Sequence, residues 1–567
     1  MVVLIAAAFM SLGLLNFGFG PNWWRGQMLR LAVGVPILLA YCYLEMPALV
    51  FPQALTLLLL PVVPNALYGL LLAARTALVG RRIVSIRRAP AIPYLIAPAA
   101  IVLFSAILAI APLVDASGLR DVVDVTLSNT LPPSADLAHV RVVPEESAIF
   151  AGDKVVGQLG AYYSVGSFNV QVERSSGRGG SDRLVWVAPL EFQGLVQWLS
   201  RHTSPGVIVV SAENPDAPAE LRQREPMRFI PSALFNENLY RHVYMTYGYE
   251  QILEMTLQLD DRGDPQYLAT LGRPTIGWIG QKVTGVVIVD PASGAMKRYP
   301  RAEFDKLPRW VSRVYPDQLA LDYNAWFGKY VHGMWNYLLA KRDVHVPARD
   351  EVFGLLAGDR FVWFVDHTSP ASDQSMTGFT YMDTVDGKMT YYTSSGGEFN
   401  SRGAENAVAS NPIVRQGKLQ PTQPLLYNAY QQNTWVVPLV APDTGKYQTL
   451  ALVQAKNGRV VLGSTASASP QNDAFARYAA LLGVSGAVAQ SGGIEHAYSG
   501  AIDRISLGPG GGIYFTLRGS RQIFSLDGAN VLALLARSGD RVNFRSPAPA
   551  AGRVALARDF RDASLAP

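Results

Sequence analysis

The sequence predicts an α-helical transmembrane bundle followed by α+β, β-rich extracytoplasmic domains and a C-terminal small β-barrel. Three observations lead to this fold class: apolar residues gather before residue 115, strand-like runs joined by glycine turns fill the middle, and closely spaced strands end the chain. The mean hydropathy of +0.14 and the 16% of charged residues are unusual for a soluble protein. The apolar excess therefore points to a membrane.

Four apolar runs approach the roughly 20 residues needed to cross a bilayer: 2–19, 31–44, 48–74 and 94–114. We therefore expect about four helices within residues 1–114. Three prolines in the third run, Pro52, Pro61 and Pro64, predict either a kinked helix or a re-entrant pair. The first run has no basic segment before it, which argues against a cleaved signal peptide.

Arginines set the expected orientation, because short loops rich in basic residues stay in the cytoplasm. Arg25 and Arg30 lie between the first two runs, and the third loop carries the topology-setting group Arg75, Arg81, Arg82, Arg87 and Arg88. With four helices, both loops fall on one side of the membrane. We thus expect a multi-pass protein in the cytoplasmic membrane of a bacterium, with residues 115–567 extracytoplasmic.

Charge and cysteine content narrow the function further. The net charge of +5 comes from the arginines of residues 1–114, so the remaining chain has no basic surplus for binding nucleic acid. The single cysteine, Cys42, lies in the second run, which excludes structural disulfides, cysteine-ligated zinc and a thiol nucleophile from the exterior region. No cofactor is expected; the expected partners are the lipid bilayer and other envelope proteins.

Composition divides the exterior region into four segments and a tail. Residues 115–138, with Pro132-Pro133, are expected to form a linker, and 139–248 an α+β domain. Residues 249–485 carry repeated hairpins. Residues 486–545 read as a small β-barrel with a glycine-rich loop at 508–512, similar at fold level to OB or SH3-like barrels. The Pro- and Ala-rich residues 546–567 are expected to be a flexible tail.

The repeated hairpins share one pattern: an apolar strand, a five-residue turn ending in glycine, and a returning strand. The turns are 290–294, 383–387 and 454–458. Glycine adopts the positive φ that closes such a turn, and Asp or Asn before it caps the turn. Each copy is therefore predicted to be a β-hairpin that joins a larger sheet or packs on a helix.

This strand, Asp-x-x-x-Gly turn and strand beside a helix resembles the PepSY domain, a small module of bacterial secreted and membrane proteins. Asp290 to Gly294 is the nearest match, and Asp383 to Gly387 is similar. The third copy has Gln454 where the family shows Asp. The resemblance implies regulatory or inhibitory binding, often of peptidases, and it brings no catalytic residues.

An aromatic helix is expected between two of the hairpins, with Trp326, Tyr330 and Trp335 among its residues and Lys341-Arg342 after it. One interpretation is an interfacial helix whose rings lie at headgroup depth on the membrane surface or against a partner. The other is a core helix between sheets.

No hydrolase, nucleotide-binding or zinc motif is present in the sequence. The pairs Asp366-His367 and Glu495-His496 could each supply half of an acid–base pair, but we expect both to be solvated strand ends. The acidic turn 260–264 could bind Ca²⁺, and it is also what a hairpin turn requires. No catalytic, cofactor or metal residue is therefore assigned.

The sequence thus favours a membrane-anchored extracytoplasmic binding or scaffold protein of the bacterial envelope, within a larger assembly. The alternative is an extracytoplasmic enzyme acting on peptide or glycan, with carboxylates brought together from distant positions. A deep cleft with convergent buried carboxylates or a histidine would favour the enzyme. A sensor is disfavoured because only short arginine loops are expected on the cytoplasmic side.

Overall fold

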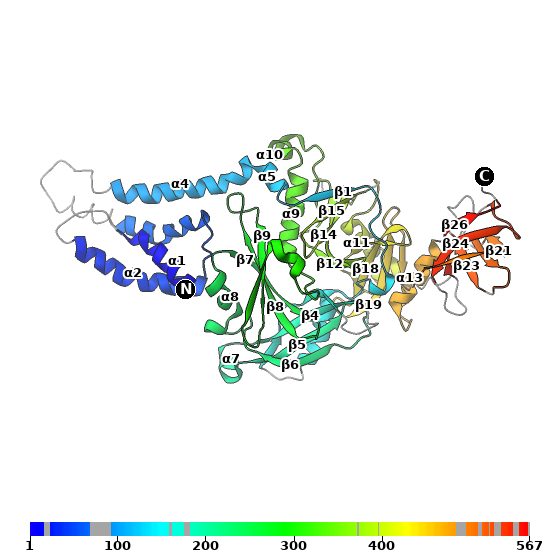
Figure 1. Ribbon diagram of the computed structural model, residues 1–567, viewed down its shortest axis with the longest axis horizontal. Coiled ribbons are helices and arrows are strands. Elements are labelled where there is room, and N and C mark those ends of the chain that lie inside the picture. Colours follow the sequence, from blue (N-terminus) through cyan, green and yellow to red (C-terminus); the bar gives the residue numbers. More distant parts are fainter. Residues whose placement is uncertain are drawn as a thin grey trace.

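A computed structural model describes residues 1–15, 23–68, 92–157, 162–174, 182–370, 374–394, 396–482, 495–507, 513–520, 522–526, 535–547 and 555–564. Figure 1 shows apolar helices at one end of the molecule, a β-rich region in the middle and a separate sheet near the C-terminus. The figure also shows that the apolar helices extend from one side of the β-rich region.

Two helices are long and apolar enough to cross a membrane, over Trp24–Glu45 and Ile96–Val114. Only 6% of the apolar window of the second is buried, so it is not a core helix. They belong to α2 (Trp23–Glu45) and α4 (Ile92–Val114). Shorter apolar helices cover Val2–Leu14, which includes α1 (Val2–Ser11), and Gln53–Tyr68.

The expected runs differ from the observed helices in three ways. Helix α2 extends further toward the N-terminus than the run 31–44, so Arg25 and Arg30 lie within its first turns. The third run begins as a 3-10 helix at Gln53–Leu58 and continues as an α-helix to Tyr68. Since two of the four segments are short, the described residues do not show a bundle of four spanning helices. Arg75, Arg81, Arg82, Arg87 and Arg88 lie outside the described residues.

The β-rich region contains four modules, each a helix followed by an antiparallel meander of strands. Module 1 comprises α6 (Glu145–Val156), β2 (Tyr163–Val165), β3 (Asn169–Glu173), β4 (Arg183–Phe192), β5 (Ser204–Ser211) and β6 (Glu220–Met227). Module 2 comprises α8 (Leu239–Tyr247), β7 (Gln251–Leu259), β8 (Pro265–Arg273), β9 (Lys282–Val289) and β10 (Met296–Pro300). Because α8 precedes its own sheet, the expected boundary at 248/249 separates a helix from its module.

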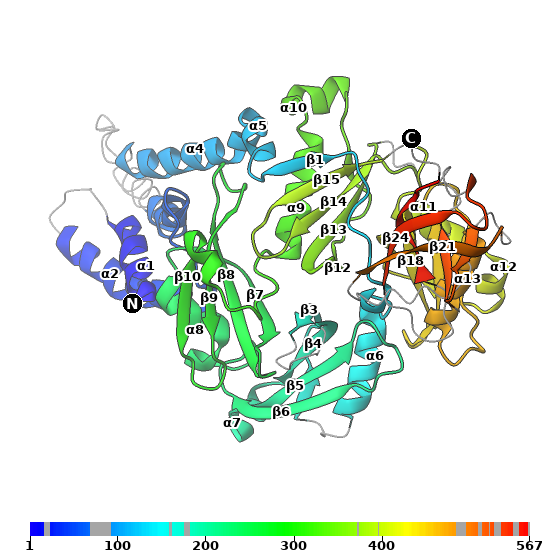
Figure 2. The ribbon, with the colours of Figure 1, turned by 45° about the vertical axis from the view of Figure 1, so that its right-hand side comes forward.

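Modules 3 and 4 repeat this order. Module 3 comprises α9 (Asp317–Lys329), β11 (Val346–Pro347), β12 (Phe353–Ala357), β13 (Arg360–Thr368), β14 (Gly378–Asp383) and β15 (Met389–Thr393). Module 4 comprises α11 (Ser401–Ala409), α12 (Pro412–Gln416), β16 (Gln420–Pro421), β17 (Leu425–Ala429), β18 (Gln432–Val440), β19 (Tyr447–Gln454) and β20 (Val460–Leu462), followed by α13 (Pro470–Leu481). Figure 2 shows the four sheets arranged around a centre.

One hydrogen bond recurs in all four modules. The segment before each helix donates a backbone N–H to the carbonyl just after the third long strand: Val143 to Ala212, Phe229 to Pro291, Tyr315 to Thr384 and Phe399 to Ala455, at 2.7–3.0 Å. Each helix is thereby tied to the hairpin of its own sheet. The four modules therefore share one arrangement of helix and sheet.

The three predicted hairpins form as β9–β10, β14–β15 and β19–β20. In each, the turn glycine has a positive φ and its amide donates to the carbonyl of the first turn residue. An aromatic ring from the segment before the helix covers each glycine, namely Phe229 on Gly294, Tyr315 on Gly387 and Phe399 on Gly458. Glycine is therefore required at these positions for two reasons: it adopts the positive φ, and it has no Cβ that would overlap the aromatic ring.

Replacing Gly387 with alanine is expected to lower the free energy of unfolding by about 2–4 kcal/mol. The new Cβ would overlap the Tyr315 ring and also take a φ of +71°. Gly358→Ala is the matched control, since its φ is +67° but nothing lies within 4 Å, so only about 1 kcal/mol of strain is expected. Equal losses in chemical denaturation of the two full-length variants would contradict the packing role of the ring.

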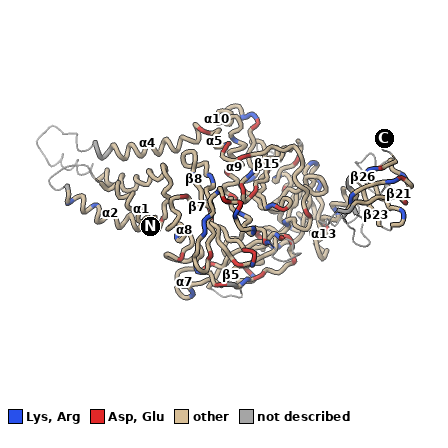
Figure 3. Tube along the Cα trace, viewed as in Figure 1, with Lys and Arg blue, Asp and Glu red and all other residues tan. Residues whose placement is uncertain are grey.

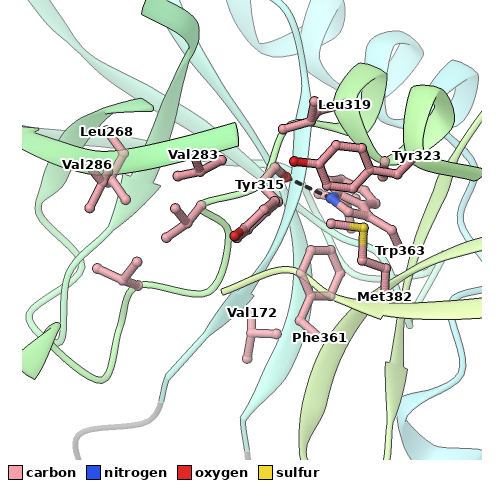
Figure 4. Close-up of a cluster of buried hydrophobic side chains, with 14 of the residues drawn as sticks. Val172, Leu268, Val283, Val286, Tyr315, Leu319, Tyr323, Phe361, Trp363 and Met382 are labelled. Atoms are coloured by element: carbon pink, nitrogen blue, oxygen red, sulfur yellow. Dashed lines mark hydrogen bonds between the residues drawn. The ribbon is translucent and has the colours of Figure 1, made fainter. Parts of the chain in front are cut away.

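The core lies between modules. Figure 4 shows Trp363 of β13 between Tyr315, Leu319, Tyr323, Phe361 and Met382, with its indole N–H donating to the Tyr315 carbonyl at 2.8 Å. Trp186 of β4 donates in the same way to the Val143 carbonyl, and Trp435 of β18 to the Phe399 carbonyl. In three of the modules, a buried tryptophan is thus hydrogen-bonded to the segment before the helix.

The apolar helices dock directly onto module 2. Val2, Ala6 and Met10 of α1 share a buried cluster with α8 and the sheet of module 2. The Tyr244 hydroxyl donates to the Pro47 carbonyl at 2.9 Å. The apolar helices and the β-rich region therefore pack together at this face.

Two expected segments turn out to be part of sheets. Residues 115–138 include α5 (Ala116–Arg120) and β1 (Val125–Ser128), which pairs in parallel with β15, so the linker is a structural strand of module 3. The expected tail contains β25 (Ala555–Leu556) and β26 (Arg558–Asp562). Phe560 is buried there, because it completes the apolar core of the C-terminal sheet.

The C-terminal sheet has the order β25-β23-β22-β21-β24-β26. Its remaining strands are β21 (Glu495–Leu507), β22 (Ile513–Leu517), β23 (Ile523–Leu526) and β24 (Arg541–Pro547). These pairings do not show an OB or SH3-like barrel. The glycine-rich loop 508–512 lies outside the described residues.

Candidate central cavity

Modules 1 and 3 share a sequence motif at the start of their helices. Arg141-Val142-Val143-Pro144-Glu145 precedes α6, and Arg313-Val314-Tyr315-Pro316-Asp317 precedes α9. The proline before each helix holds the backbone extended where the chain enters the helix. The acidic residue lies in the first turn, where its negative charge interacts favourably with the helix dipole. The two arginines therefore stand at equivalent places in the two modules.

The two arginines reach across to each other's module. The Arg141 guanidinium donates to the Gly354 carbonyl at 3.1 Å, and the Arg313 guanidinium donates to Asn169 Oδ1 at 3.0 Å. Gly354 pairs with Trp363 in module 3, and Asn169 lies beside the equivalent pairing in module 1. These reciprocal bonds show that modules 1 and 3 face each other at this point.

Each arginine also lies over the tryptophan of its own module. In addition, each one binds a residue of a further module. Arg141 is 5.3 Å from the Trp186 ring centre and donates to Gln423 Oε1 of module 4 at 3.1 Å. Arg313 is 4.7 Å from the Trp363 ring centre and donates to Glu254 of module 2. Both side chains are almost fully buried. The arginines therefore join all four modules at one place.

A cavity of about 700 Å³ lies at this junction. Its lining comes from modules 1, 3 and 4 and contains three arginines and six carboxylates: Arg141, Arg313, Arg349, Glu145, Glu146, Asp317, Asp350, Glu351 and Glu405. Figure 3 shows charged residues gathered in the centre of the β-rich region. The carboxylates outnumber the arginines, so the lining is acidic.

The arginines are already engaged by protein groups. Arg313 pairs with Glu254 and, at 3.6 Å, with Asp317, and Arg349 pairs with Glu405. Burial lowers the pKa of Arg141 to about 10, which still leaves it charged at neutral pH. The groups that remain to meet a ligand are therefore the surplus carboxylates.

Glu145 differs from the other carboxylates of the lining. Burial, followed by the neighbouring Glu146, raises the pKa of the Glu145 carboxyl. Glu146 in turn accepts a hydrogen bond from the Thr422 hydroxyl at 2.8 Å. Chemically, the cavity can hold a cationic group against several carboxylates, or offer Glu145 as an acid.

The three aromatic residues predicted for a membrane or partner surface lie in different environments. Trp326 is 8% exposed and belongs to the core, so it does not form a surface. Tyr330 is half-buried, and Trp335 is 75% exposed beyond the end of α9. Helix α9 ends at Lys329, and the chain turns away at His332 and Gly333, which take left-handed conformations. The sequence spacing alone could not show this break.

Asp366 and His367 are buried on opposite faces of β13 and do not form a pair. Asp366 accepts a hydrogen bond from the Ser401 amide at 2.7 Å, and burial raises the pKa of its carboxyl. His367 Nδ1 lies 2.8 Å from His345 Nδ1, and its Nε2 bonds Asn324. The expectation of solvated strand ends is wrong here, because both side chains pack between module elements.

The buried histidine pair predicts a loss of stability in acid. Burial and then the charge of Arg120 lower the pKa of His345 to about 4, and burial lowers that of His367. Because the unfolded chain binds these protons near pH 6.5, stability is full above that pH and falls as the pH drops toward 4. We expect His345 to contribute about 1–2 kcal/mol to the loss between pH 7 and 5.

The measurement is the free energy of unfolding of the full-length protein at pH 7 and pH 5. His345→Asn should reduce this pH dependence, whereas His202→Asn, at an exposed position, should leave it unchanged. Equal pH dependence in all three proteins would contradict the assignment.

The remaining candidates have structural roles or lie apart from the cavity. The Asp260 carboxylate accepts from the amides of Arg262 and Asp264 at 2.8 and 2.9 Å, so it is used to close the β7–β8 turn. Glu495 and His496 begin β21, away from the central cavity lining. Among the described residues, no group of three or more His, Cys, Asp or Glu could hold a metal ion.

Sequence reasoning missed every arginine of the cavity. The signal was present: the Arg-Val-x-Pro-acidic motif occurs at 141–145 and 313–317, and Trp-Val-x-Pro-Leu occurs at 186–190 and 435–439.

No protein-family model and no curated protein matches this chain.

Proposed function

We propose that this chain is a multi-pass protein of the bacterial cytoplasmic membrane, whose residues 115–567 form an extracytoplasmic binding or scaffold region within a larger assembly. In this proposal the hairpin modules are PepSY-like units. The central cavity is the binding site. It receives cationic groups, such as lysine or arginine side chains of a protein partner.

The paths of the apolar helices support this orientation. Near the end of α2, the Tyr43 hydroxyl donates to Asn236 of the β-rich region at 3.2 Å. Near its start, Arg30 lies 5.1 Å from the Tyr68 ring centre, at the end of the segment 53–68. Arg25 and Arg30 thus lie at the end remote from the β-rich region, as the positive-inside rule requires for an exterior β-rich region.

The observation that carries the binding role is the acidic surplus of a partly open lining. In it Arg313 and Arg349 are paired with carboxylates, and Arg141 is hydrogen-bonded to Gly354 and Gln423. A cation entering this cavity gains several carboxylate partners without breaking an existing ion pair. An anion would meet repulsion from those same carboxylates.

The experiment measures binding of pentalysine to the full-length protein in detergent by isothermal titration calorimetry. Asp350 and Glu351 are exposed residues of the cavity lining, so the double variant Asp350→Asn, Glu351→Gln should fold. We expect pentalysine to bind at low salt, more weakly as salt rises, and at least about tenfold more weakly to the double variant. The control Asp359→Asn, Asp443→Asn removes two exposed carboxylates elsewhere. Absent binding, or equal weakening in this control, would overturn the site.

Membrane orientation has its own test. Alkaline phosphatase fused after Pro567 should be active in a bacterial host, because the enzyme matures only outside the cytoplasm. A cytosolic reporter at the same position should then be silent. The reverse result would overturn the orientation.

The raised pKa of Glu145 favours a second candidate, an extracytoplasmic enzyme that acts on peptide or glycan. In that case Glu145 would protonate a leaving group while Asp317 or Glu351 acted as base or nucleophile. Incubation of the full-length protein with casein and with peptidoglycan separates the two candidates. Product formation that is lost in Glu145→Gln, with pentalysine binding kept, would establish the enzyme.

A further inference from the structure

Two short helices carry exposed apolar side chains at opposite edges of the β-rich region: α10 lies beside α5, and α7 lies at the far edge beyond α8 (Figures 1 and 2). The α7 patch consists of Leu195, Val196 and Leu199 on α7 (Leu195–Arg201), with exposed fractions of 54%, 73% and 53%. The α10 patch consists of Trp335, Leu338 and Leu339, with exposed fractions of 75%, 54% and 77%. It spans α10 (Gly333–Trp335) and the π-helix Asn336–Ala340.

Both patches end in basic residues. Arg201 closes α7, and Lys341 and Arg342 follow the π-helix. Apolar and aromatic side chains followed by basic ones are typical of segments at a membrane surface, where the rings and aliphatic chains enter the headgroup layer and the cations meet lipid phosphates.

Each patch is connected to the end of a span. Helix α10 packs against α5, which begins two residues after Val114, the last residue of α4. Val114 itself is 81% exposed, so the apolar surface of α4 continues to this point. On the other edge, Trp198 of α7 lies 5.8 Å from the Phe235 ring, and the next residue, Asn236, accepts from Tyr43 near the end of α2.

We propose that the α7 patch and the α10 patch both rest on the lipid surface from which α2 and α4 emerge, so that the β-rich region stands on the membrane at two separate contacts. The proposal rests on the proposed membrane orientation. A lipid surface fits better than a protein partner, because two patches of like composition are each connected to the end of one of the two long apolar helices. The two contacts would fix the tilt of the β-rich region.

The test uses the full-length chain in nanodiscs of phosphatidylcholine and phosphatidylglycerol, with Cys42→Ala and one new labelled cysteine. The labelled positions are Val196→Cys, Trp335→Cys and the control Ile413→Cys, which is 65% exposed on α12 of module 4. A lipid with a nitroxide on its headgroup should quench the labels at 196 and 335 at least twofold more than the label at 413. Leu103→Cys, 64% exposed on α4, should be quenched by a nitroxide deep in the acyl chain.

Quenching at 103 but not at 196 or 335 would overturn the two contacts and leave the spans intact. Absence of quenching at 103 would overturn the membrane orientation itself. If the labels at 196 and 335 were shielded from both the lipid nitroxide and aqueous iodide, a protein would cover the patches and the lipid proposal would fail.

Discussion

Trp435→Ala is expected to lower the free energy of unfolding by about 3–5 kcal/mol. Trp435 is fully buried in module 4, and its indole N–H donates to the Phe399 carbonyl at 2.9 Å. Alanine leaves a large cavity beside Phe364 and an unpaired carbonyl in the segment before α11. The measurement is chemical denaturation of the full-length protein, followed by far-ultraviolet circular dichroism.

Trp335→Ala is the matched control, because the same atoms are removed from a side chain that is 75% exposed. It should change the free energy of unfolding by less than about 0.5 kcal/mol. Similar losses in the two variants would mean that the indole of Trp435 does not fasten module 4.

Arg313→Met is expected to lower the free energy of unfolding by about 3–5 kcal/mol. Methionine keeps much of the volume over Trp363 but removes the bonds to Asn169 and Glu254. The Glu254 carboxylate would then be charged and largely buried without its partner. Arg360→Met removes an exposed arginine paired with Asp383 at 3.1 Å and should cost at most about 1 kcal/mol.

The pH dependence distinguishes a lost ion pair from lost packing. Burial raises the pKa of Glu254 even with Arg313 present, and removal of Arg313 should raise it further. The unfolded-state pKa of a glutamate is near 4.3, and the folded-state pKa of Glu254 lies above it. Folding is therefore favoured where Glu254 is protonated, at low pH, and this stabilisation is lost as the pH rises through the folded-state pKa. The loss in Arg313→Met should therefore shrink as the pH falls from 7 toward 5.

Adding Glu254→Gln to Arg313→Met should recover part of the stability at pH 7 and remove the extra pH dependence. A loss that is independent of pH, and that Glu254→Gln does not reduce, would assign the effect of Arg313 to packing alone.

These predictions follow from a repeat that sequence inspection recognised only in part. The hairpin turns at 290–294, 383–387 and 454–458 were predicted correctly, because a turn is decided by residues that adjoin one another. Module 1 escaped recognition because its β5–β6 connection is longer and lacks the glycine turn. The sequence analysis also did not place each helix with the sheet that follows it. The hydrogen bond that joins them links residues about 55–70 positions apart.

The strands within residues 115–138 and 546–567 were missed for a related reason. A strand such as β1 or β26 carries little local signal, and what makes it a strand is the free edge of β15 or β24 that it meets. Trp326 shows the same limit for burial. Its spacing fits an amphipathic helix of either kind, and only the sheet packed over α9 decides that it faces the core.

The sequence by itself determined the apolar helices and their arginine distribution, the absence of cysteine beyond Cys42 and the three glycine turns, since each depends on neighbouring residues or on composition. The tertiary structure alone decided the central cavity. Arg141 and Gly354 are 213 residues apart, and Arg313 and Asn169 are 144 apart. They meet only because modules 1 and 3 bury their apolar faces against each other, and that packing brings the paired charges to one point.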